Sequence, residues 1–183
     1  VQQRLRKLAM PHAVLDVHVA NDSGDASRDA AGDNVVFLLA ANPGSEALPL
    51  TKVASGGELA RTMLALRLVL TEGPHTLVFD EVDAGIGGSA ANSMAESLSR
   101  LAKAHQIFVV THLAQVAAVA DHHVVVEKNI VERSGVEVTL ASAAEVSGAR
   151  RVDEIARMLS GRPDSTAARR HAKELLESRV TTD

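Results

Sequence analysis

The stretch Thr76-Leu77-Val78-Phe79-Asp80-Glu81 decides the fold class of this chain. Its apolar residues predict a short buried strand, and two carboxylates follow where that strand would end. A second apolar run covers residues 106–110, beyond a helical pattern over 89–104. Strand, helix and strand, with both strands apolar, are typical of a parallel sheet that is covered on both faces. The sequence therefore predicts an α/β fold with a mostly parallel sheet flanked by helices.

Further elements are expected on both sides of this unit. Residues 1–10 form a helical pattern that Pro11 ends, and residues 21–33 form an acidic loop expected at the surface. The remaining patterns predict strands over 13–20 and 35–41, helices over 59–70 and 113–120, a hairpin of 124–127 with 136–140, and closing helices over 150–159 and 166–179. Polar residues follow the central strands at their carboxyl ends, where α/β sheets place their ligands.

The composition limits the classes of function. The chain has 183 residues, no cysteine and a net charge of −4, which excludes a disulfide framework and a cysteine zinc site and disfavours a dedicated basic nucleic-acid module. With three Phe and no Tyr or Trp, bases have little to stack on, so any DNA contact would run through Lys and Arg to phosphates. Because no membrane-length apolar stretch or signal pattern is present, we expect a cytoplasmic protein.

Asp80 and Glu81 are the first candidates for chemistry. The first carboxylate after a buried strand can hold Mg²⁺, usually through water, because this ion gives up its hydration shell reluctantly. The second carboxylate can reach an attacking water as a general base. Taken alone, the same pair is also compatible with an acidic strand end in solvent.

Ser55-Gly56-Gly57-Glu58 is the second candidate and leads the apolar helix that follows. Ser and Glu at this spacing form a capping box, which is the structural interpretation. Two glycines in the first turn nevertheless cost a helix about 1 kcal/mol each relative to Ala. Glycine lets another group approach the backbone amides, and the start of a helix attracts anions. The motif therefore predicts a phosphate contact as well as a cap.

His112 and Asp83 complete the set of candidates. His112 follows the second apolar strand and so occupies the place that Asp80 and Glu81 occupy on the first, whereas the other seven histidines are expected to be structural. Asp83 lies in the Gly-rich turn Val82-Asp83-Ala84-Gly85-Ile86-Gly87-Gly88.

The order of these motifs resembles that of ABC ATPases: signature, helix, Walker B, D-loop, helix and switch histidine. Lys52-Val53-Ala54-Ser55-Gly56-Gly57-Glu58-Leu59, Phe79-Asp80-Glu81-Val82-Asp83-Ala84-Gly85-Ile86 and Thr111-His112-Leu113-Ala114-Gln115-Val116-Ala117 resemble the RecN family of SMC-like ABC ATPases. Met10-Pro11-His12 and Ala172-Lys173-Glu174-Leu175-Leu176 extend the resemblance over nearly the whole chain. The Gly-Ile-Gly-Gly form of the D-loop differs from the common ABC ending and also resembles RecN.

The resemblance implies a role for each candidate. Asp80 would hold Mg²⁺ through water, and Glu81 would be the general base for ATP hydrolysis. The signature Ser55, Gly56, Gly57 and Glu58 would contact the γ-phosphate of ATP bound to the opposite subunit. Asp83 would touch the partner subunit, and His112 would hydrogen-bond near the γ-phosphate.

No phosphate loop of the form G-x-x-x-x-G-K-[ST] occurs in the sequence. In the family that loop lies in an N-terminal half, separated by a long coiled coil. Residues 1–10 are therefore expected to be the end of that coil, and residues 11–183 the C-terminal lobe of the head. The expected partners are the N-terminal half, a second head, DNA and RecA. The expected function is ATP-driven DNA double-strand break repair at the nucleoid, with the isolated chain inactive.

Two other interpretations are open on the sequence alone. A metal-dependent nuclease or phosphohydrolase would use Asp80, Glu81, Asp83 and His112 directly on its metal, but it leaves the Ser55 motif unexplained. A non-catalytic dimerisation module would carry the motifs as remnants. The basic residues of the last two helices are read as a solvated face, with a phosphate-contacting strip as the alternative: Arg150, Arg151, Arg157, Arg162, Arg169, Arg170, Lys173 and Arg179.

Overall fold

The chain divides into two compact units, Val1–Thr111 and His112–Asp183. The computed structural model describes residues 1–20, 34–70, 73–133, 136–162 and 164–178. The acidic loop expected over 21–33 lies outside the described residues, as do Pro163 and Arg179. None of the described helices combines the length and the apolar character that crossing a lipid bilayer requires.

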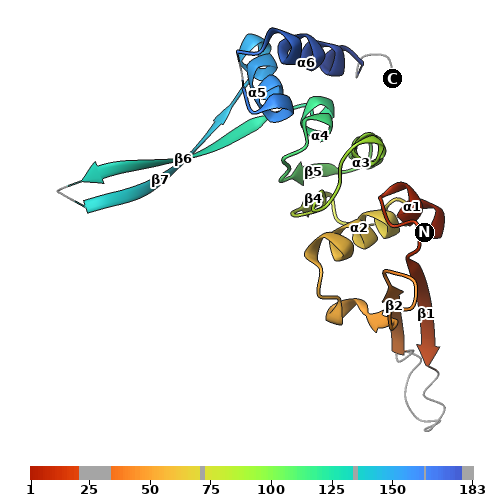
Figure 1. Cartoon of the computed structure of the whole chain (residues 1–183). Helices are drawn as coiled ribbons and strands as arrows, with labels where there is room; N and C mark the ends of the chain where they lie inside the picture. Colours follow the sequence, from red (N-terminus) through yellow and green to blue (C-terminus); the bar gives the residue numbers. More distant parts are fainter. Residues whose placement is uncertain (21–33, 71–72, 134–135, 163, 179–183) are drawn as a thin grey trace. The chain divides into compact units, whose positions relative to one another are not determined.

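The first unit opens with a short helix and an antiparallel sheet (Figure 1). Helix α1 (Gln2–Lys7) ends earlier than the predicted residue 10, and its Leu5 is fully buried. Strand β1 (Val14–Ala20) pairs with β2 (Asn34–Ala40), and β2 pairs in turn with the two-residue β3 (Leu48–Pro49). Both predicted strands are confirmed, and η1 (Leu50–Lys52) then leads towards the next helix.

The centre of the first unit is the predicted strand, helix and strand. Strand β4 (Thr76–Phe79) and β5 (Gln106–Val109) pair in parallel, with Phe79 opposite Val109. Helix α3 (Ser89–Ala102) connects them and buries an apolar stripe consisting of Ala91, Met94, Ala95, Leu98 and Leu101. These residues recur at helical spacing, so one side of α3 faces the core. The α/β prediction with a parallel sheet and flanking helices is confirmed.

The prediction that both faces of this sheet are covered is wrong for the described chain. Val78, Phe108 and Val110 are 69%, 55% and 62% exposed, whereas Phe79 is buried. Successive side chains of a strand point to opposite faces. The described elements of the first unit cover one face of the β4–β5 pair and leave the other face open. The apolar runs could not show this, because a strand covered on one face and a strand covered on both can have the same apolar sequence.

The described part of the second unit combines a hairpin with helices (Figure 1). Strands β6 (Val124–Arg133) and β7 (Val136–Glu145) form an antiparallel hairpin that is longer than predicted, because the polar run Glu127-Lys128-Asn129 interrupts the apolar residues of β6. Helices α4 (Ala114–Val119), α5 (Gly148–Ser160) and α6 (Thr166–Ser178) follow the predicted order. Their small core residues allow close packing around Ile155: Ala114, Ala117, Ala118, Ala156, Ala168 and Ala172.

Candidate functional site

Ser55 caps the helix that the candidate motif leads. Helix α2 (Gly56–Arg67) begins directly after Ser55, whose Oγ accepts a hydrogen bond from the Glu58 amide at 3.3 Å. The predicted helix over 59–70 therefore started three residues late, because the cap draws both glycines into the first turn. The N-cap role of Ser55 is confirmed.

Two exposed carboxylates follow β4. Phe79 is buried at the end of the strand, while Asp80 and Glu81 lie at the surface of the unit. Glu81 has a φ of 56°, a left-handed conformation that is costly for a residue with a side chain. Its amide donates to Asp80 Oδ1 at 2.9 Å. Two accessible carboxylates fit a cation that keeps much of its water shell, as Mg²⁺ does.

The first turn of α2 contacts the loop after β4. A Cβ atom added at Gly56 would collide with Glu81 Oε2. One added at Gly57 would lie 2.9 Å from the Ala84 Cβ and 3.2 Å from the Glu81 carbonyl oxygen. The chain's own loop therefore occupies the space that these glycines open, and the glycines bring the Ser55 motif and the carboxylates together within one unit.

Arg61 joins the same contact and was missed by the sequence analysis. It is only 8% exposed, and its Nη1 donates to the Ala84 carbonyl oxygen at 2.8 Å. Burial lowers the pKa of the Arg61 guanidinium, and the nearby charge of Glu58 opposes that shift. The available signal was its spacing: Arg61 comes four residues after Gly57 and therefore lies on the same face of the helix.

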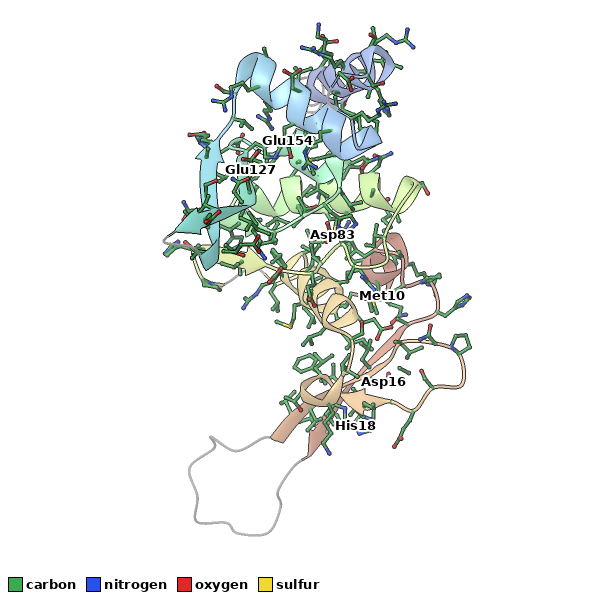
Figure 2. All side chains as sticks on the ribbon, turned by 60° about the vertical axis from the view of Figure 1, so that its left-hand side comes forward. Met10, Asp16, His18, Asp83, Glu127 and Glu154 are labelled. Atoms are coloured by element: carbon green, nitrogen blue, oxygen red, sulfur yellow. The ribbon has the colours of Figure 1, made fainter. Side chains whose placement is uncertain are left out.

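Asp83 is held inside the turn that precedes α3 (Figure 2). It is 3% exposed, and Thr111 Oγ1 donates to its Oδ2 at 2.5 Å. The turn is closed by hydrogen bonds from the Ala84 amide to the Glu81 carbonyl and from the Ile86 amide to the Asp83 carbonyl, each 3.0 Å. The D-loop candidate is thus tied to the end of β5.

His112 is the first residue of the second unit and is exposed. It is therefore not among the candidates that the first unit gathers, which are Ser55, Gly56, Gly57, Glu58, Asp80, Glu81 and Asp83. In the described part of the chain, no three His, Asp or Glu side chains are grouped so as to hold a metal ion. A Mg²⁺ site here would rest on one or two carboxylates plus phosphate oxygens, which is the usual arrangement for this ion.

Three arginines of the second unit are engaged in local contacts. Arg151 Nη2 donates to three carbonyls at the end of α4, those of Ala117, Ala118 and Ala120, at 3.0, 3.3 and 2.6 Å. Arg157 pairs with Glu154 and Arg169 with Asp153, each at 2.7 Å. These three arginines therefore serve in a helix cap and in ion pairs, while the solvated face and the phosphate-contacting strip both stay predictions for the basic helices.

Comparison with known proteins identifies relatives over nearly the whole chain. It is 48% identical to the DNA repair protein RecN of Deinococcus radiodurans over 94% of its length, and 45% identical to the RecN of Streptomyces coelicolor over 97%. The resemblance to RecN is confirmed. The chain spans 29% and 32% of these two relatives, and the part that it matches is a C-terminal segment of RecN. No family model matches the sequence.

Solved structures of SMC head domains are also similar to this chain. An Smc head domain with an extended coiled coil from Pyrococcus furiosus, bound to the C-terminal domain of ScpA, matches 78% of this chain and 33% of that chain. The TM-score is 0.48 and the sequence identity is 21%. An Smc head with a coiled coil and joint from Pyrococcus yayanosii matches with the same TM-score at 20% identity, covering 76% of this chain and 25% of that one.

Proposed function

We propose that this chain is the C-terminal ATPase-head segment of a RecN-like DNA repair protein. It would bind and hydrolyse ATP with Mg²⁺ at an interface between two heads. The observation that carries the proposal is the contact between the first turn of α2 and the Glu81 loop. This contact brings a capped helix start, whose dipole favours phosphate, next to two exposed carboxylates.

Each candidate then has a specific role. Asp80 holds hydrated Mg²⁺, and Glu81 accepts the proton of the attacking water. Ser55, Gly56, Gly57 and Glu58 contact the nucleotide of the partner head, whose γ-phosphate carries the charge that a helix start attracts. His112 approaches the same phosphate from the strand after Asp83, and Asp83 contacts the partner head.

The exposed apolar side chains support a second part of the proposal. Val78, Phe108 and Val110 form an open sheet face that a folded protein normally covers. The N-terminal half of the same protein, which would bring the phosphate loop, is the proposed cover. Residues 1–10 would be the end of the connecting coiled coil, and residues 11–183 the C-terminal lobe. The further proposed partners are a second head, DNA and RecA, at the nucleoid in the cytoplasm.

The deciding experiment compares two substitutions in the full-length protein. Glu81→Gln should lower the turnover of ATP at least about 100-fold, because a general base contributes 10²–10⁴-fold, while ATP binding persists and holds two heads together longer. Glu96→Gln, an exposed glutamate on α3, is the matched control and should leave turnover unchanged. Wild-type turnover by Glu81→Gln, or metal-dependent phosphoester hydrolysis without ATP, would refute the proposal.

A further inference from the structure

Arg61 is a buried cation inside the apolar side of α2. Its neighbours along this face include Leu64 and Ala65, which are fully buried. Its Nη1 makes the hydrogen bond to the Ala84 carbonyl at 2.8 Å, whereas its Nε is buried without a hydrogen-bond partner in the described part of the chain. A guanidinium in this position is therefore only partly satisfied.

A buried, only partly hydrogen-bonded guanidinium is not expected at a position whose only role is to stabilise the fold. Burying a charged group is costly unless it is paired and fully hydrogen-bonded, and apolar residues of similar size often stabilise a protein more. The lowered pKa of Arg61 reflects the same desolvation. The contact that Arg61 makes therefore points to a role other than filling the core.

That contact bears on the catalytic candidate. Ala84 closes a turn whose first residue is Glu81, through the 3.0 Å hydrogen bond between the Ala84 amide and the Glu81 carbonyl. Glu81 itself has the left-handed φ of 56°, and strained backbone of this kind persists only where several contacts restrain it. Arg61 restrains the turn from the side of α2, and its Nη1 lies 3.0 Å from the position that a Cβ of Gly57 would take.

We infer that Arg61 is a positioning residue for Glu81. It holds the loop from Glu81 to Ala84 against the first turn of α2, and so keeps the carboxylate where it can act as a base. The inference rests on the proposed function. It adds a link within one head. Arg61 joins the first turn of α2, which is proposed to face the partner's nucleotide, to Glu81, which is proposed to serve the head's own nucleotide.

The test is a double-mutant cycle in the full-length protein, with single-turnover ATP hydrolysis as the readout. Arg61→Met keeps a long apolar stem without the donor. It should lower the hydrolysis rate about 10- to 100-fold, as expected for a misplaced catalytic group, with little change in ATP affinity. Arg61→Lys, which retains a charged donor, should lose less. In the Glu81→Gln background, Arg61→Met should have no further effect, since its action passes through the carboxylate.

Arg67→Met, on the same helix and partly buried, is the matched control and should leave the hydrolysis rate of each background, wild type and Glu81→Gln, unchanged. Melting temperatures of all variants separate a loss of folded protein from a loss of rate. The inference fails if Arg61→Met hydrolyses ATP at the wild-type rate, if its effect multiplies with that of Glu81→Gln, or if the rate falls only in proportion to lost folded protein. Undiminished turnover by Glu81→Gln alone would instead overturn the proposed function.

Discussion

Thr111 donates a hydrogen bond to Asp83 at 2.5 Å, which ties the end of β5 to the loop after β4. Asp83 is 3% exposed, so its carboxylate depends on partners inside the protein. The pair joins residues that lie 28 positions apart in the chain. It fixes the loop that presents Glu81 at one end and begins α3 at the other.

Replacing Thr111 with Val should therefore destabilise the first unit. Loss of one donor to a buried carboxylate is expected to lower the free energy of unfolding by about 1–3 kcal/mol. The loss is measured as a shift in the urea midpoint, and hydrogen exchange of the β5 amides locates it in the first unit. Thr76→Val is the control, because Thr76 bonds Gln106 at an exposed position, and it should change stability little. Equal effects of the two substitutions would show that the bond to Asp83 contributes nothing special.

Ser55→Arg in the full-length protein should leave ATP binding to one head nearly unchanged and abolish ATP-driven pairing of heads. A bulky side chain does not fit where the start of α2 is proposed to meet the partner's phosphate. Ser55→Ala isolates the cap and should cost about 0.5–2 kcal/mol of stability. ATP affinity, sedimentation with and without ATP, and melting temperature are measured on both variants. If pairing persists in Ser55→Arg, the cap is the whole role of Ser55.

The 183-residue chain alone should show no ATPase activity above background. Its sequence has no phosphate loop, which supplies the main cradle for the β- and γ-phosphates. Adding the N-terminal half of the protein should restore turnover, measured as phosphate release. Robust hydrolysis by the chain alone would favour the metal-dependent hydrolase among the alternatives.

His123 should make the second unit less stable in mild acid. Burial lowers the pKa of His123, and the positive charge of Arg151 lowers it further. Because the folded pKa lies below the unfolded value of 6.5, the stabilising contribution is complete above pH 6.5 and is lost as the pH falls below it. The melting temperature of the wild type should drop more between pH 7.5 and 5.5 than that of His123→Gln. His171→Gln, exposed on α6, should retain the wild-type dependence.

Much of the fold and of the candidate site could be predicted from the sequence, because it depends on interactions between residues close together in the chain. The apolar runs at β4 and β5 and the helical pattern between them predicted the parallel pair, because strand and helix periodicities act over a few residues. Ser55 was recognised as a cap for the same reason, since its oxygen and the Glu58 amide are three residues apart. The full length of the hairpin was missed because the polar run Glu127-Lys128-Asn129 breaks the apolar pattern of β6.

Only the tertiary structure decided how these pieces meet. Gly57 and Ala84 are 27 residues apart in the chain, yet a Cβ on Gly57 would lie 2.9 Å from that of Ala84. Nothing local to Gly57 indicates that neighbour, and nothing local to Arg61 indicates its bond to the Ala84 carbonyl. The sequence by itself determined the elements and the chemical groups that follow them. The tertiary structure decided which group each glycine admits and which faces remain open, because these depend on packing between segments that the chain keeps far apart.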